Sequence, residues 1–308
     1  MRPVLALALS AGFVVTAGTA QEPVALKWSL KEGQTFYAKG VADMDMSMGL
    51  FGQNVDMKVN TTSVQRFKIT SIKDGATTVE MTFLDMTTEV KGIPGGGGLP
   101  GLGDIGEKIK GAKIGAVLDE KMEVTKLIGY EKFLDKLAGD DDAKRDLYAA
   151  QFSEGVVGQM VSQVFASAPP GAVKVGDTWS RTTKVPAAGL GDAVVKEKFT
   201  LLSVSNQVAK IGVTGEMSFK QGKGGVPGLP PGFTVSKFAM KADQYKGSQT
   251  FDLKAGRLRD SAVDMGMKGS IEISANGMDL AMTIRAKVKQ SVTVTDTMPV
   301  SGKKPVDD

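Results

Sequence analysis

The stretch that decides the fold is residues 263–294, VDMGMKGSIEISANGMDLAMTIRAKVKQSVTV. On both sides of the central Asn276-Gly277 pair, apolar residues alternate with polar ones, which is the period of a β-strand with one buried face. Asn-Gly between two such runs is a strong signal for a tight hairpin, because both residues tolerate positive φ. The stretch therefore predicts a long antiparallel hairpin with one apolar face and one wet face.

The length of this hairpin implies curvature. A return strand over residues 278–294 would span about 55 Å at roughly 3.3 Å per residue, far beyond the usual five or six residues. A strand of that length must curl with the twist of its sheet in order to cover a core. We therefore expect a curved antiparallel sheet whose concave side is rich in methionine.

The same alternation fills much of the remaining chain. It recurs over residues 35–48, 55–69 and 79–83, with Asp74-Gly75 as a second hairpin turn. Between residues 130 and 165 the period changes from two to 3.6, which predicts three helices, the second capped by Asp140-Asp141-Asp142 and the third opened by Ser153. The predicted fold class is α+β, mostly antiparallel β.

The second half of the chain resembles the first. KVGDTW at 174–179 answers KEGQTF at 31–36, and the loop GGVPGLPPG at 224–232 answers GGGGLPGLG at 95–103. We interpret this as a duplicated curved β-sheet module with a helical insertion between the two copies. The predicted division is a first module plus insert at 21–171, a second module at 172–297 and a disordered tail at 298–308.

The N-terminus has the form of a signal peptide. Arg2 precedes an apolar run over residues 4–17, and small residues at 18 and 20 predict cleavage between Ala20 and Gln21. The apolar run is shorter than the roughly twenty residues that span a bilayer, and no later stretch approaches that length. We expect an exported protein, periplasmic or secreted, without a transmembrane segment after cleavage.

Composition argues against several functional classes. The chain contains no His and no Cys, so the commonest general base, metal ligand and thiol nucleophile are all missing. We find no nucleophile elbow or phosphate loop and predict a protein that is not an enzyme, with no catalytic residues, metal or cofactor. Asp140-Asp141-Asp142 lacks the spacing of a Ca²⁺ loop and fits a helix cap better. The formal net charge is only +4, and the Lys and Arg residues form no clustered basic stripe in the sequence. Both observations argue against nucleic acid as a partner.

Three motifs together resemble a known family. LKWSLKEG at 26–33, LDEKMEVTK at 118–126 and VKVGDTW at 173–179 are similar to an uncharacterised family of exported bacterial proteins, a domain of unknown function. That resemblance implies no particular activity. A weaker, fold-level resemblance is to the half-barrels of periplasmic lipoprotein carriers, although Met122 stands where their hairpin turn would have Gly.

The sixteen methionines carry the functional hypothesis. A methionine stripe at strand spacing forms either close-packed core or an adaptable cavity wall for an apolar, lipid-like ligand. Same-face residues lie nearly 7 Å apart along a strand, too far for one Cu(I) ion to be held without folding. The candidate ligand-binding residues are Met44, Met46, Met48, Met265, Met267, Met278, Met282 and Ile284. The alternative is a structural protein of the cell envelope that presents its two Gly/Pro-rich loops to a protein partner.

Overall fold

The computed structural model describes residues 22–299, apart from 51–52, 93–104, 166–167, 170, 187–190, 222–232 and 276–277. The described strands form one sheet in the order β5-β4-β3-β2-β1-β11-β10-β9-β8-β7-β6. The strands are β1 (Thr35–Leu50), β2 (Gln53–Lys73), β3 (Ala76–Lys91), β4 (Lys113–Leu118), β5 (Val124–Ile128), β6 (Thr178–Pro186), β7 (Gly191–Ser205), β8 (Val208–Gln221), β9 (Phe233–Asp252), β10 (Arg257–Ala275) and β11 (Met278–Thr295).

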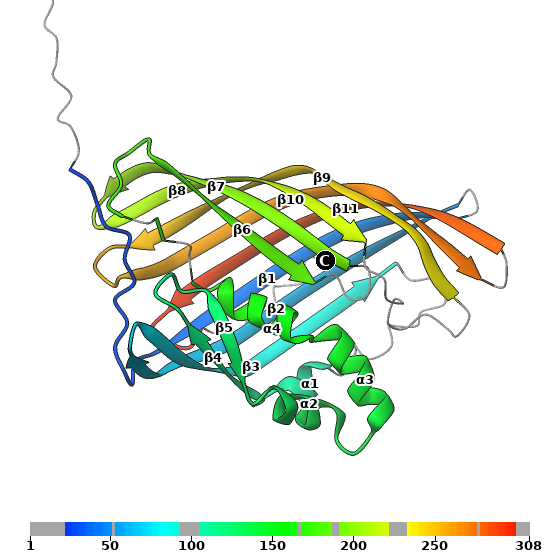
Figure 1. The fold of residues 1–308 in the computed structure, drawn as a ribbon, viewed down its shortest axis with the longest axis horizontal. Coiled ribbons are helices and arrows are strands. Elements are labelled where there is room, and N and C mark those ends of the chain that lie inside the picture. Colours follow the sequence, from blue (N-terminus) through cyan, green and yellow to red (C-terminus); the bar gives the residue numbers. More distant parts are fainter. Residues whose placement is uncertain are drawn as a thin grey trace, which may run out of the picture.

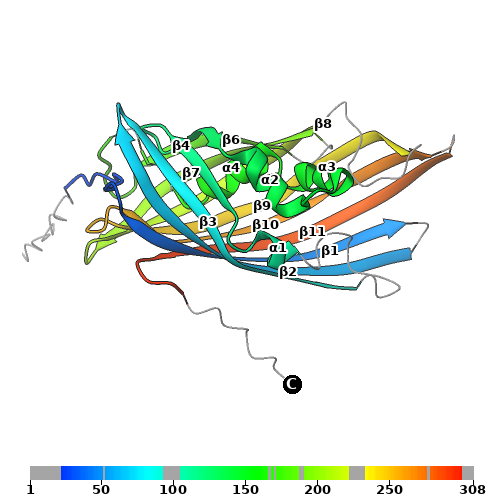
Figure 2. The same ribbon diagram turned by 90° about the horizontal axis from the view of Figure 1, so that it is seen from below.

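The predicted long hairpin is confirmed. Strands β10 and β11 pair antiparallel, with Met265 opposite Val288 and Ile271 opposite Met282, so the apolar residues of both strands share one face. The turn residues Asn276 and Gly277 lie outside the described residues. Figures 1 and 2 show the whole sheet curling around the helices, as expected for strands of this length.

The predicted hairpin turn at Asp74-Gly75 is confirmed, and a second turn at Asn206-Gln207 has the same backbone form. Asp74 and Gly75 have φ values of 51° and 76°, and Asn206 and Gln207 have 50° and 61°. Positive φ at both central residues matches the right-handed twist of the flanking strands. These turns connect β2 to β3 and β7 to β8, so each half of the sheet is a meander of neighbouring strands.

The three predicted helices are also confirmed. They are α2 (Tyr130–Ala138), α3 (Asp142–Gln151) and α4 (Glu154–Ser162). Asp141 caps α3 by accepting a hydrogen bond from the Lys144 amide at 3.0 Å, and Ser153 caps α4 by accepting one from the Val156 amide at 3.4 Å. The periodicity did not reveal the five-residue helix α1 (Ile105–Ile109).

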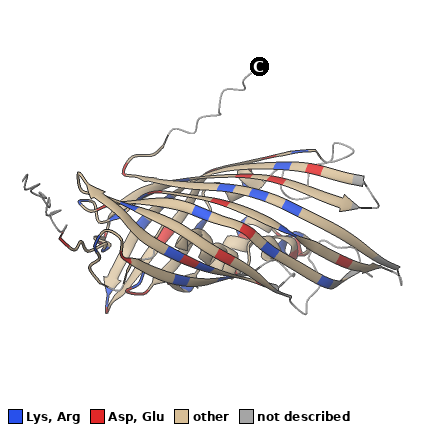
Figure 3. Cartoon of the chain, turned by 90° about the horizontal axis from the view of Figure 1, so that it is seen from above, with Lys and Arg blue, Asp and Glu red and all other residues tan. Residues whose placement is uncertain are grey.

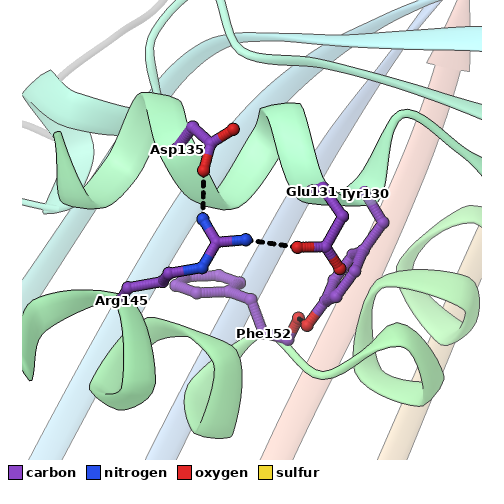
Figure 4. A network of polar contacts seen from close by, with 5 residues as sticks. All are labelled: Tyr130, Glu131, Asp135, Arg145 and Phe152. Atoms are coloured by element: carbon purple, nitrogen blue, oxygen red, sulfur yellow. Dashed lines mark hydrogen bonds and ion pairs between the residues drawn. The ribbon is translucent and has the colours of Figure 1, made fainter. Parts of the chain in front are cut away.

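A polar network ties helices α2 and α3 together (Figure 4). The Arg145 guanidinium donates to Asp135 and Glu131, which lie one turn apart on α2. The Tyr130 hydroxyl donates to the carbonyl of Phe152 at 2.8 Å. Burial, followed by the charges of Glu154 and Glu131, raises the pKa of Tyr130, so this hydroxyl stays protonated and can donate.

Helix α4 lies between the two edges of the sheet. Strands β5 and β6 are the edge strands, and α4 packs against both (Figure 1). A cavity of about 430 Å³ at this seam is lined by residues of all three elements, among them Lys126, Gly158 and Arg181. An edge strand exposes unpaired backbone groups, so a covering helix protects it from pairing with another chain.

The aromatic core lies where β1 begins. Phe36 and Phe67 stack at 5.4 Å between ring centroids, and Phe165, which follows α4, packs edge-on against both at 6.1 Å. Trp28 packs on Phe165 at 4.9 Å. The alternation around Leu26 and Trp28 suggests a strand, yet this segment forms only an isolated bridge between Val24 and Val173. Leu26 and Trp28 are buried because the segment crosses one end of the sheet and packs against the core there (Figure 1).

The two predicted modules share one continuous sheet, joined where β1 pairs with β11. The mostly antiparallel β class is therefore correct, while the internal duplication and the insertion of the helices between copies stay predictions. The predicted signal peptide and most of the predicted tail lie outside the described residues. Within the described ranges, no helix is both long enough and apolar enough to cross a membrane.

The outer face of the sheet is charged. Lys, Arg, Asp and Glu are spread along its strands (Figure 3), and neighbouring strands pair them, as in Lys58–Asp45 at 3.6 Å and Lys268–Asp243 at 3.3 Å. These side chains are largely exposed, so each pair contributes little to stability, about 0–1 kcal/mol. Mixed charge of this kind is typical of a solvated surface, and it leaves the inner face as the candidate for binding.

Candidate functional site

Strand register brings the predicted methionines together. Met44 lies opposite Val288, which in turn lies opposite Met265, and Met46 lies opposite Ala286, which lies opposite Met267. Met48 lies opposite Ile284 on the next rung. Met282 continues the same face along β11, opposite Ile271, and the register places Met278 four residues earlier, opposite Ala275. The seven predicted residues whose side chains are described thus share the inner face of β1, β10 and β11, and we name all eight the methionine trough.

The trough is only partly covered. The seven members whose side chains are described are all intermediate in exposure, unlike the core methionine Met81, which is 1 % exposed. An open groove of about 940 Å³ is lined by Met46, Met265 and Met267 and also by residues of the outer face such as Asp45 and Lys268, so it does not by itself show space on the inner face. The partial exposure of the methionines is the observation that differs from a close-packed core, in which they would be buried. Whether they bind a ligand stays a prediction.

A polar belt crosses the same inner face between the aromatic core and the methionine trough. On β2 the apolar stripe is interrupted by Thr61, Ser63 and Gln65, which lie opposite Ala42, Gly40 and Ala38 of β1. On β11 it is interrupted by Gln290, opposite Ala42 from the other side. We define the polar belt as Thr61, Ser63, Gln65 and Gln290 together with Gln159 and Gln163 from the region of α4.

Helix α4 and the belt enclose a cavity of about 310 Å³. Gln290 Nε2 donates to Gln163 Oε1 at 2.7 Å and so joins the sheet to the end of α4. Gln65 Nε2 donates to Ser63 Oγ at 2.9 Å. The full lining is Gly40, Val41, Ala42, Thr61, Ser63, Gln65, Phe83, Met86, Val156, Gln159, Met160, Gln163, Val164, Gln290 and Val292.

The sequence contained a signal for this belt. Residues 61, 63 and 65 have the parity of the apolar stripe Val59, Phe67, and residue 290 has the parity of Val288 and Val292. A polar residue at a position of apolar parity marks a break in the buried face. The breaks are visible in sequence, but only the pairing of β1 with both β2 and β11 shows that they meet.

A buried charged cluster lies farther along the inner face of the sheet. Arg181 of β6 donates two hydrogen bonds to Glu197 Oε2, at 2.7 and 3.0 Å, and the Tyr245 hydroxyl donates to Glu197 Oε1 at 2.7 Å. Burial, followed by the charge of Glu197, raises the pKa of Tyr245. The Glu197 carboxylate accepts hydrogen bonds from the Arg181 cation and from the Tyr245 hydroxyl. Because the charge is paired within the cluster, we assign the cluster a structural role.

Tyr245 reaches Glu197 by lying over Gly215. A Cβ atom added at Gly215 would be 2.8 Å from Tyr245 Cδ1 and 2.9 Å from the carbonyl oxygen of Lys196. Both contacts are shorter than real Cβ atoms make, so glycine is required for this approach. The Tyr245 ring thus occupies the space that a side chain at position 215 would fill.

Other predicted features are placed as follows. Asp141 caps a helix and forms an ion pair with Lys144 at 2.6 Å, in agreement with the predicted role of the Asp140-Asp141-Asp142 run. In the part of the chain that the structure describes, no group of three or more acidic side chains could hold a metal ion. The two Gly/Pro-rich loops lie outside the described residues, so the interaction hypothesis that depends on them stays a prediction.

Comparisons with known proteins identify a family and distant folds. No curated protein matches the chain. Among solved structures, one described as "Lipid-protein interactions in lipovitellin" aligns with a TM-score of 0.44 and 8% identity, over 90% of this chain and 27% of that one. The COG4313 outer membrane channel from Pseudomonas putida F1 aligns with a TM-score of 0.26 and 8% identity, over 89% of this chain and 99% of that one. This chain thus spans about a quarter of the first structure's length, and neither likeness carries a functional argument.

The family model is the stronger finding. It matches residues 74–258, which include two of the three motifs on which the resemblance was based, at 118–126 and 173–179. The third motif, at 26–33, precedes the matched region. Because the match covers more than half of the chain, the protein belongs to the family of unknown function DUF6263.

Proposed function

We propose that this protein binds an apolar, chain-like small molecule along the methionine trough and acts as an exported binding protein, not as an enzyme. The observation that carries the proposal is the partial exposure of a continuous methionine face on the inner side of a curved sheet. Soluble proteins seldom leave large apolar patches open unless something binds them.

The dimensions of the trough suit such a ligand. From Ala42 to Met48 the inner face of β1 runs for about 20 Å at 3.3 Å per residue. A single acyl chain spans about 15 Å, half of the bilayer's hydrocarbon core. Methionine side chains are flexible and polarisable, so they can adapt to chains of different shape.

The helices leave this part of the sheet accessible. The cavity under α4 extends to Ala42 on β1 and to Gln290 on β11, and the next inward-facing residues are Met44 and Val288. Figure 1 shows strands β9, β10, β11 and β1 extending past the helices. A ligand could therefore enter along the trough while the aromatic end stays packed.

Export and the absence of catalysis are parts of the same proposal. They are supported by the sequence of residues 1–20 and by a chain without His or Cys. A carrier or receptor for an apolar molecule needs neither residue. Mass spectrometry of the secreted or periplasmic fraction, with Gln21 as the mature N-terminus, tests the export step.

The test of binding uses a fluorescent dodecyl chain carrying a dansyl amide. Saturable enhancement of its emission by the purified protein is expected. Met46→Lys should weaken binding at least about tenfold, since losing one buried apolar contact of this size costs about 1.5–3 kcal/mol. The matched control is Thr283→Lys, an exposed outer-face position on β11 between Met282 and Ile284 that does not line the groove, and it should change affinity less than about twofold. Absence of saturable binding by the wild-type protein would overturn the proposal.

A further inference from the structure

The polar belt adds chemical information that the methionine trough alone does not contain. Its four glutamines Gln65, Gln159, Gln163 and Gln290 and the hydroxyls of Thr61 and Ser63 line a single cavity of about 310 Å³. That volume lies at the lower end of the range for small-molecule sites and corresponds to about ten water molecules. The cavity is thus large enough for a polar headgroup but too small for a whole lipid.

The cavity is polar without being charged. Among the described residues that line it, none is Asp, Glu, Lys or Arg. Moving an ionised group into such a site without a countercharge costs several kcal/mol, whereas hydroxyl, ester and amide groups can be matched by hydrogen bonds. The lining therefore selects against carboxylates, phosphates and quaternary amines.

Primary amides suit a neutral polar group well. Each glutamine offers two donors and one acceptor oxygen, and the bond between Gln290 and Gln163 uses one donor of the first and one lone pair of the second. Whichever way the two amides are turned, the pair retains both N–H donors and acceptor capacity. A ligand bearing both hydroxyl and carbonyl groups can satisfy these positions together.

The belt and the trough are continuous along one face. Ala42 and Gln290 belong to the cavity, and the next inward residues on their strands, Met44 and Val288, lie opposite each other in the trough region. Successive inward residues are about 7 Å apart along a strand. A chain lying in the trough therefore brings its end group within reach of the belt.

We propose that the ligand is an uncharged amphiphile, with its hydroxyl- or ester-bearing head held by the polar belt and its single alkyl chain in the methionine trough. This inference rests on the proposed function and adds the class of headgroup to it. Of the common single-chain lipids, a monoacylglycerol has this chemistry.

The experiment is displacement of the dansyl-dodecyl probe by three competitors with the same chain length, all kept below their micelle concentrations. They are monolauroylglycerol, laurate and dodecyltrimethylammonium. Monolauroylglycerol should compete at concentrations about tenfold lower than either charged amphiphile, a difference of about 1.4 kcal/mol. Equal or stronger competition by laurate or by the cation would overturn the inference while leaving the proposed function intact.

Variants locate the headgroup. Gln290→Met should weaken monolauroylglycerol binding about tenfold and change laurate binding less than about twofold, because only the neutral head uses the amide. Gln207→Met is the matched control, since Gln207 is exposed and lines neither the cavity nor the groove. Gln159→Met is a second test from the helix side and does not depend on the bond to Gln163. Unchanged monolauroylglycerol affinity in both variants contradicts the inference, and failure of the probe itself to bind removes the proposed function with it.

Discussion

Gln290 on strand β11 and Gln163 at the C-terminal end of helix α4 are joined by a 2.7 Å hydrogen bond, although they lie 127 residues apart in the chain. The bond holds the helix over the centre of the sheet, where β1 meets β11. Phe165, two residues after Gln163, packs against Trp28, Phe36 and Phe67. The same short segment therefore closes the aromatic core on one side and the polar cavity on the other.

A double-mutant cycle measures this link. Gln290→Leu and Gln163→Leu should each lower the free energy of unfolding by about 1 kcal/mol, the usual net worth of one hydrogen bond. Because the two amides interact with each other, the double variant should lose less than the sum, with a coupling of at least about 0.5 kcal/mol. Urea unfolding of the unliganded protein gives the four values. Additive losses would show that the bond does not contribute in solution.

Methionines of the trough and of the core should respond differently to a charge. Met282 is half-buried, so in Met282→Lys the long side chain can carry its ammonium to water, and the protein should fold with a midpoint close to wild type. Met81 is 1 % exposed, so Met81→Lys buries an unpaired charge and should abolish folding.

Circular dichroism and urea melts of both variants provide the comparison. A smaller probe of the same difference is Met282→Ala, which should cost under about 2 kcal/mol, against about 2–5 kcal/mol for truncation in a close-packed core. If Met282→Lys fails to fold in the same way as Met81→Lys, the trough is sealed core and the binding proposal loses its basis.

The sequence predicted the faces of the strands better than their neighbours. Alternating polarity correctly assigned Met265, Met267 and Met282 to one face, because side chains of a strand alternate whatever the strand pairs with. Parity carries no information about pairing between distant segments, so it could not show that β1 lies beside β11. That pairing creates the polar belt and continues the trough across both halves of the chain.

Other misses have local causes. Leu26 and Trp28 alternate with polar residues as a strand would, yet their segment crosses the sheet end and forms only one bridge, since burial of alternate residues needs a surface and not a ladder. Helix α1 is too short to show a period. Met122 adopts a φ of 61° in the turn between β4 and β5, a position where glycine would be expected.

Gly215 should tolerate no side chain. In Gly215→Ala the new methyl group would meet the Tyr245 ring and the carbonyl oxygen of Lys196, both within 2.9 Å, and the backbone contact cannot rotate away. We expect a loss of about 1–3 kcal/mol, typical of overpacking. Gly171→Ala is the matched control, because nothing lies within 4 Å of its added Cβ. Thermal melts of both variants provide the measurement. An equal loss of stability in the two variants would contradict the packing described for Tyr245.

The hydroxyl of Tyr245 makes stability depend on pH in the alkaline range. Its pKa is raised by burial and by the neighbouring Glu197 carboxylate, so the folded protein holds this proton more tightly than the unfolded chain does. The resulting stabilisation is complete below the unfolded-state pKa of about 10 and is lost as the pH rises above that pKa.

Tyr245→Phe lacks the proton and the hydrogen bond, and should be less stable than wild type by about 1–3 kcal/mol at pH 8, because Glu197 loses a donor. The gap between the two proteins should then narrow between about pH 10 and pH 12, by up to 1.4 kcal/mol per pH unit. Urea unfolding at several pH values provides the measurement, and a gap that stays constant across this window would show that Tyr245 titrates normally and is not held by Glu197.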